Sequence, residues 1–204
     1  MNRGSNAGEA NTTAPTGVRD LQFHPPENGH LVVAAFKVPE AGALSFTATQ
    51  SYSVFAWVNV PSLGNRPQGI VTKSWIVAPW YGIWASSANE WAYGSSAANI
   101  LGPAVTSGWH FISLVQDASL NARYLYVDGV KVGEAGAAPA NGPGNLYFGR
   151  ADQFSNEYFE GTLDEINISN AARSGSWISA QYSSTQDQFI TYSTDLPATA
   201  SPPN

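Results

Sequence analysis

The sequence contains no cysteine, which excludes disulfide bonds and thiolate metal sites. It has only nine lysines and arginines against fifteen acidic residues, giving a net charge of −6 with no basic run. Nucleic-acid binding needs clustered cations that neutralise phosphates, so no nucleic-acid partner is expected. No segment reaches the ~18 apolar residues needed to cross a bilayer, so we expect no membrane insertion.

Both ends of the chain consist of small and polar residues with no periodic pattern of apolar residues. We interpret residues 1–16 as a flexible linker or expression remnant, because they lack the apolar stretch of a signal peptide. Residues 195–204 are interpreted as a flexible tail. Residues 17–194 then form a single domain, since β-sandwiches of this length often fold as one unit. We expect this domain to be part of a larger polypeptide and to be monomeric.

The middle of the chain favours strands, because it is rich in Gly, Ser, Thr and aromatic residues and poor in Leu, Lys and Glu. In 52–60 both alternating faces are largely apolar, which indicates a central strand covered on both sides. Asp128-Gly129 separates two strand-like runs and predicts a hairpin. Ser174 is a candidate N-cap for one short C-terminal helix. The predicted strands are 18–23, 30–38, 52–60, 69–74, 109–117, the two arms of 123–135, 145–150 and 160–169.

Strands at this spacing, with no convincing helix between them, predict an all-β antiparallel sandwich. The order of LQF, HLVV, GIVTKS, GWHFISLVQD, YLYVDGVKV, LYFGR and FEGTLDEINISNAARS resembles the laminin-G-like members of the concanavalin A-like lectin/glucanase superfamily. The resemblance covers most of 17–183 and implies a jelly roll of two antiparallel sheets. It also implies a module that is commonly non-catalytic, extracellular, and attached to bacterial enzymes or surface proteins.

Two adjacent acids, Asp164 and Glu165, invite a catalytic interpretation. On an extended strand they point to opposite faces, so they cannot converge on one glycosidic bond. The nearest other acids are Glu157 and Glu160, and their spacing does not place all three carboxylates, with Asp164, on one sheet face. We therefore expect no glycosidase activity from this motif.

Asp164 lies on the more apolar face and needs a partner. The resemblance implies that this aspartate helps to hold a structural calcium ion, although His24 stands where related sequences often carry an acid. The alternatives are hydrogen bonds to the backbone amides of a turn, or an ion pair with Arg173 or Arg150. The isolated histidines give no zinc-ligand spacing.

The segment 73–96 contains four of the seven tryptophans. Indole rings offer flat apolar faces on which sugar rings stack. If Ile83 faces the core, Trp80 and Trp84 lie on the opposite face as a stacking pair, while about half of the six aromatic residues are structural. Trp57 and Trp109 are expected to pack in the fold. The candidate ligand-binding residues are Trp75, Trp80, Tyr81, Trp84, Asn89, Trp91, Tyr93 and Arg150.

The sequence thus predicts a non-catalytic carbohydrate-binding module that recognises a neutral poly- or oligosaccharide through exposed aromatic residues. Its expected location is extracellular, secreted by a bacterium or on its surface. One alternative is a protein-interaction or adhesion module that uses the same aromatic surface. The third is a glycan-cleaving enzyme, which would need carboxylates converging in a cleft, such as Glu90 with Asp152 or Glu157.

Overall fold

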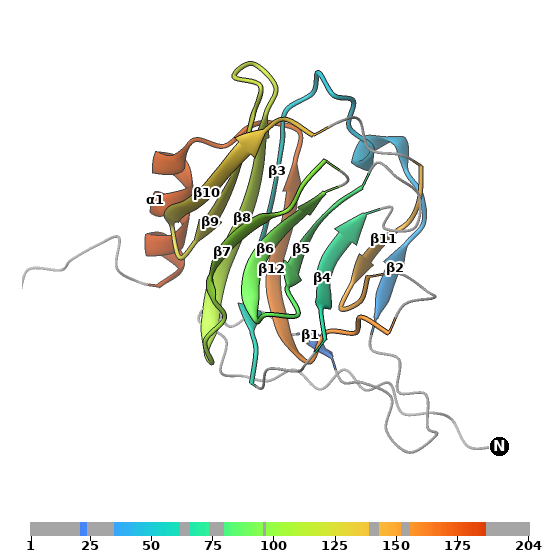
Figure 1. The fold of residues 1–204 in the computed structure, drawn as a ribbon, viewed down its shortest axis with the longest axis vertical. Helices are drawn as coiled ribbons and strands as arrows, with labels where there is room; N and C mark the ends of the chain where they lie inside the picture. The colour runs from blue at the N-terminus through green and yellow to red at the C-terminus, as the bar shows by residue number, and fades with distance from the viewer. Residues whose placement is uncertain are drawn as a thin grey trace, which may run out of the picture.

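The computed structural model describes residues 21–23, 35–61, 66–73, 80–95, 97–138, 143–151 and 156–186. These residues form two six-stranded antiparallel sheets that face each other as a sandwich, with one helix at the side (Figure 1). The predicted fold class is confirmed.

The first sheet has the strand order β1-β12-β3-β8-β9-β10, and the second has the order β2-β11-β4-β5-β6-β7. A short 3-10 turn, Gly42–Leu44, follows β2, and the helix α1 spans Gly175–Thr185. The first sheet consists of β1 (Leu21–Phe23), β12 (Gly161–Ser169), β3 (Tyr52–Asn59), β8 (Trp109–Asp117), β9 (Ala122–Val127) and β10 (Val130–Gly136). The second consists of β2 (Phe36–Val38), β11 (Leu146–Phe148), β4 (Gln68–Lys73), β5 (Tyr81–Ala85), β6 (Glu90–Ser95) and β7 (Ile100–Ala104).

The predicted strands that fall within the described residues are present. The predicted ranges did not include β5 and β6, which lie in the aromatic segment 73–96, or β7, for which the sequence carries no strand signal. β7 contains Gly102-Pro103, a pair that usually marks a turn. Among the described strands β7 lies at the edge of the second sheet beside β6, and an edge strand is a position where proline is tolerated.

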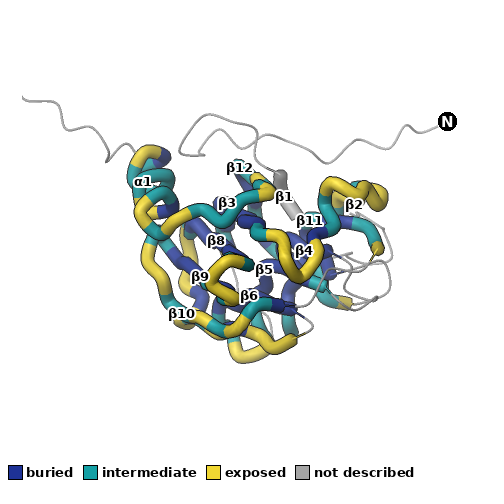
Figure 2. Tube along the Cα trace, turned by 90° about the horizontal axis from the view of Figure 1, so that it is seen from above, coloured by how far each residue is buried: buried dark blue, intermediate teal, exposed yellow. Residues whose placement is uncertain are grey.

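The main core lies between the two sheets. Figure 2 shows the buried chain concentrated in the middle strands of both sheets, with exposed chain in the connecting loops. β3 lies between β12 and β8, and its Tyr52, Val54, Ala56 and Val58 face this core. Its other face carries Phe55 and Trp57, which pack under α1, so the prediction of a strand covered on both sides is confirmed.

Helix α1 covers the outer face of the first sheet and lies beside β9 and β10 (Figure 1). Ser174 caps it, because its Oγ accepts the Trp177 N–H at 3.2 Å. Ile178 is fully buried, and the ring of Tyr182 stacks on Trp57 with centroids 5.6 Å apart. The predicted helix and the packing role of Trp57 are confirmed, and Trp109 also packs against this cluster.

The hairpin between β9 and β10 turns at Asp128 and Gly129, whose φ angles are +51° and +78°. Both residues tolerate this left-handed backbone, as the Asp-Gly signal predicted. A Cβ at Gly129 would lie 3.2 Å from the Cα of Ser179, so the absence of a side chain also lets α1 approach the hairpin closely.

Candidate functional site

The outer face of the second sheet, which points away from the core, carries the predicted tryptophan pair. Ile83 of β5 is buried between the sheets, whereas Trp84 packs with Ala92 of β6 and the half-buried Trp80 on the opposite side. The predicted phase of β5 is therefore confirmed. Leu101 of β7 pairs directly with Ala92, so its side chain lies on this outer face, and it is 51% exposed. We call Trp80, Trp84, Ala92, Gly94 and Leu101 the Trp80 platform.

Two glycines make room for the indole rings of this platform. A Cβ at Gly94 would lie 2.6 Å from Cζ3 of Trp80 and 2.7 Å from Cδ1 of Trp84. A Cβ at Gly82 would lie 2.9 Å from Nε1 of Trp84. The two indoles meet edge to face with centroids 5.9 Å apart. The rings therefore lie directly against the backbone of β5 and β6, which holds them in one orientation.

The structure corrects the prediction for three aromatic residues of the same segment. Tyr81, Trp91 and Tyr93 are at most 1% exposed and belong to the core between the sheets. The reason is the register of the β5–β6 pair: Tyr93 lies opposite Ile83, and Trp91 lies opposite Ala85. Directly paired residues share a face, so these side chains cannot extend an outer platform.

Trp84 is on the predicted face, but only 6% of its surface is exposed, because Trp80, Ala92 and Ala151 cover it. Its predicted role as an exposed stacking surface is therefore wrong, and it supports Trp80 instead. Trp75 lies outside the described residues.

The two predicted polar companions occupy separate loops. Asn89, with φ of +58°, forms the turn between β5 and β6, where its carbonyl accepts the Val105 N–H. Arg150 is nearly buried, with its guanidinium 4.8 Å from the centroid of the Tyr158 ring. Its carbonyl accepts the hydroxyl of Thr72, which ties this loop onto β4.

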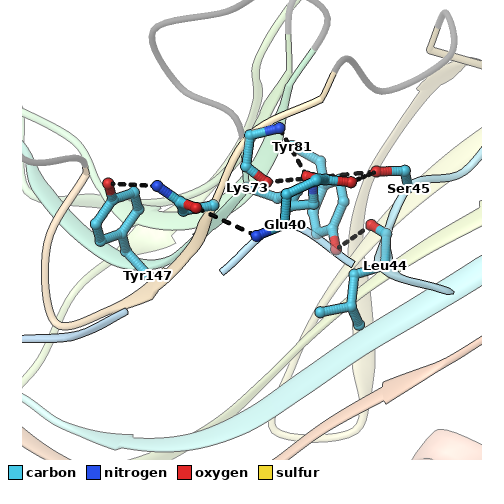
Figure 3. Close-up of polar contacts among 8 residues, drawn as sticks. Glu40, Leu44, Ser45, Lys73, Tyr81 and Tyr147 are labelled. Atoms are coloured by element: carbon cyan, nitrogen blue, oxygen red, sulfur yellow. Dashed lines mark hydrogen bonds and ion pairs between the residues drawn. The ribbon is translucent and has the colours of Figure 1, made fainter. Parts of the chain in front are cut away.

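An ion pair between the buried Lys73 and the partly exposed Glu40 lies at the end of β4 (Figure 3). The side chain of Lys73 is fully buried, and its Nζ donates to Glu40 Oε2 at 2.6 Å and to the Gly144 carbonyl at 2.7 Å. Glu40 also accepts the Ser45 hydroxyl and the Gly144 N–H, each at 2.7 Å. These contacts join the loop after β2 to β4 and to the segment before β11.

The electrostatics of this ion pair favour the charged carboxylate. The hydrogen bond from Lys73, followed by that from Ser45, lowers the pKa of Glu40 from 4.5 to about 2. Glu40 therefore remains charged in mildly acidic solution, and Lys73 keeps its counter-ion.

The adjacent acids Asp164 and Glu165 lie at a bulge in β12, where Glu165 has φ of +47°. Asp164 is 4% exposed, and its Oδ1 accepts the Glu165 N–H at 2.7 Å. This confirms the alternative of a bond to backbone rather than an ion pair with Arg173 or Arg150. Burial raises the pKa of Asp164, and the Glu165 N–H opposes this effect.

Asp164 Oδ2 is buried and has no hydrogen-bond partner among the described residues, so this oxygen suits a cation. Calcium, however, takes six to eight oxygen ligands. The part of the chain that the structure describes contains no cluster of three acidic, histidine or cysteine side chains able to hold an ion. Asp164 thus supplies one candidate ligand, the described residues supply no complete ligand set, and calcium binding stays a prediction.

His110 takes part in a hydrogen-bonded chain at the start of β8. Its Nδ1 lies 2.8 Å from Asp128 Oδ2, and its Nε2 lies 2.9 Å from the hydroxyl of Thr106. Asp128 Oδ1 accepts the Phe111 N–H. The carboxylate raises the pKa of His110. These hydrogen bonds link the hairpin turn to β8, and the linkage fits the structural role of His110.

No described helix has both the length and the apolar character needed to span a bilayer. No curated protein is significantly similar to this chain in sequence.

Solved structures share the fold at low sequence identity. A protein from Bacteroides ovatus that has been proposed to bind carbohydrate is 17% identical, with a TM-score of 0.58 over 70% of this chain and 43% of that chain. Domain 4 of AbnA, an extracellular arabinanase from Geobacillus stearothermophilus solved with arabinotriose, is 19% identical, with a TM-score of 0.56 over 71% and 70%. A Trypanosoma rangeli sialidase is 16% identical, with a TM-score of 0.54 over 71% and 24%.

The likeness to these structures concerns the fold alone, and this chain spans less than half the length of the Bacteroides protein and of the sialidase. Family membership rests on the sequence itself. Residues 34–179 match the family described as the concanavalin A-like lectin/glucanases superfamily. The chain therefore belongs to the concanavalin A-like lectin/glucanase superfamily.

Proposed function

We propose that this domain is a non-catalytic module that binds a neutral glycan on the outer face of its second sheet. The observation that carries the proposal is the half-buried indole of Trp80, which packs against Gly94 of β6 and the ring of Trp84 on the sheet face that also carries the exposed Leu101. An indole held in one orientation loses little side-chain entropy when a sugar ring stacks on it. The shallow face implies affinities in the micromolar to millimolar range.

The comparisons support a carbohydrate ligand in general terms. Domain 4 of the Geobacillus arabinanase was solved with a neutral trisaccharide, and this chain covers 70% of that domain. The sialidase offers less support for catalysis, because only 24% of its length is matched. By analogy with the arabinanase, we propose that the domain is secreted or surface-borne in a bacterium and belongs to a larger polypeptide.

The proposed binding is tested by isothermal titration calorimetry with arabinotriose, xylotriose, cellotriose and mannotriose. Trp80→Ala removes the stacking surface, and Trp80→Phe keeps a smaller flat ring. An aromatic contact contributes about 0.5–1.5 kcal/mol beyond the buried area. We therefore expect Trp80→Ala to weaken binding about tenfold and Trp80→Phe to weaken it less.

Val130→Ala, which trims an exposed apolar residue of the β9–β10 hairpin, is the control that should leave affinity unchanged. Equal affinities in the wild type and Trp80→Ala would refute the placement of the site. Absence of binding to every oligosaccharide, together with retention of a protein partner by the wild type and not by Trp80→Ala, would favour the adhesion alternative.

A further inference from the structure

A groove of about 590 Å³ lies on the outer face of the first sheet, on the side of the molecule opposite the Trp80 platform. This volume falls in the range of small-molecule sites. Tyr124 and Tyr126 of β9 form the floor with Val115 of β8, and the loop 172–175 that enters α1 forms one wall. Figure 1 shows α1 beside β9 and β10, the strands that carry Tyr124, Tyr126 and Lys131. No sequence signal marked it, because its walls come from distant segments.

The floor offers an aromatic surface. Tyr124 is half buried and meets Tyr126 edge to face, with centroids 6.4 Å apart. The ammonium of Lys131 on β10 lies 5.2 Å from the centroid of the Tyr124 ring and 2.7 Å from Glu134. Because about half of the Lys131 side chain is exposed, its ammonium can swing to the rim when another group takes the ring face.

The wall of the groove is held in place before any ligand binds. The hydroxyl of Ser53 on β3 donates to the Ala171 carbonyl at 2.8 Å and accepts the Arg173 N–H at 2.9 Å. The guanidinium of Arg173 stacks 4.8 Å from the centroid of the Trp177 ring, which itself packs on Phe55. A wall anchored to both the sheet and the helix needs little ordering on binding.

Polar atoms at the rim complete the lining. Arg173 Nε is buried and has no hydrogen-bond partner among the described residues. The carboxylate of Asp117 makes its described bonds through Oδ1 alone, to the N–H and hydroxyl of Ser119 and the N–H of Leu120. Because this nitrogen is buried, the groups available at the rim are the Asp117 carboxylate as an acceptor and the half-exposed Lys131 ammonium as a donor.

The charges around the groove balance, since Lys131 and Arg173 are matched by Asp117 and Glu134. A strongly anionic or cationic ligand gains no net attraction from such a lining. A sugar ring, by contrast, has an apolar C–H face for Tyr124 and hydroxyls that both donate and accept. We propose that this groove is a second saccharide site, which takes a neutral sugar residue stacked on Tyr124. The inference rests on the proposed glycan-binding function but uses the opposite sheet.

Two sites on opposite faces would let one domain engage two segments of a polymer or two chains, which raises the avidity for polysaccharide over short oligosaccharide. The test titrates the isotope-labelled full chain with arabinotriose, xylotriose, cellotriose, mannotriose and trigalacturonate. NMR amide chemical shifts report which residues respond to each sugar. Tyr124→Ala removes the ring face, Tyr124→Phe keeps it, and Trp80→Ala removes the other site. Thermal melting checks that each variant is folded.

We expect a neutral trisaccharide to shift amides around both Trp80 and the groove. Tyr124→Ala should weaken the groove response about tenfold, whereas Tyr124→Phe and Trp80→Ala should keep it. Shifts confined to the Trp80 platform would overturn the second site and leave the proposed function intact. Tighter groove binding of trigalacturonate than of every neutral sugar would overturn the neutral class. If no neutral sugar shifts any amide signal, the result would refute both the proposed glycan function and this inference.

Discussion

The ion pair between Glu40 and Lys73 makes the stability of this domain sensitive to acid, and Glu40→Gln tests this directly. Folding lowers the pKa of Glu40 from 4.5 to about 2. A carboxylate with a lowered folded-state pKa contributes stability above its unfolded value, and loses it as pH falls toward the folded value. The contribution is therefore complete above about pH 5 and disappears between about pH 5 and pH 2.

The magnitude follows from the pKa values and the exposure. The separation between 4.5 and about 2 corresponds to at most about 3 kcal/mol, since one pKa unit is worth about 1.4 kcal/mol. Glu40 is 36% exposed, so solvent screens the interaction, and we expect about 1–2 kcal/mol. At neutral pH, Glu40→Gln should cost about 2 kcal/mol, because it leaves the fully buried Lys73 without a counter-ion.

Lys73→Met is the matched variant and should cost less, about 1 kcal/mol or below, because it buries no charge and leaves Glu40 in contact with solvent. Urea denaturation followed by circular dichroism at pH 7, 5, 4 and 3 gives the free energy of unfolding for each protein. The wild type should lose about 1 kcal/mol more than Glu40→Gln between pH 5 and pH 3, because part of the contribution remains until the pH reaches the folded-state pKa of about 2. Parallel pH profiles for the two proteins would refute the reasoning.

Three further predictions concern other parts of the fold. Gly94→Ala places a methyl group against Trp80 and should cost about 1–3 kcal/mol of unfolding free energy and alter tryptophan fluorescence; a spectrum and stability like the wild type would contradict the packing. Asp128 raises the pKa of His110, so this contact stabilises the fold below about pH 6.5 and weakens as the pH rises through the folded-state pKa. Asp128→Asn should therefore flatten the dependence of the melting temperature on pH above neutral pH, and a dependence like that of the wild type would argue against this role of the contact. If Asp164 holds calcium, millimolar calcium should raise the melting temperature of the wild type and not of Asp164→Asn, whereas equal melting in calcium and chelator would count against the ion.

Local sequence signals determined most of the architecture. Alternation identified the central strand β3, Asp128-Gly129 located the hairpin, and Ser174 located the start of α1, because each depends on backbone preferences within a few residues. Alternation in β5 also placed Trp80 and Trp84 on the face opposite Ile83, and the structure shows that the Ile83 face is the core face. The FEGTLDEINIS motif pointed to the family for the same reason of local pattern.

Tertiary structure alone decided which aromatic rings meet solvent. Trp91 and Trp84 stand in similar short strands, yet one lies in the core and the other under Trp80, because strand register sets the face and neighbouring loops set the cover. The groove on Tyr124 likewise depends on the loop before α1 being anchored to β3. Exposure is a property of contacts between segments far apart in the chain, and a single sequence read along its length does not contain those contacts.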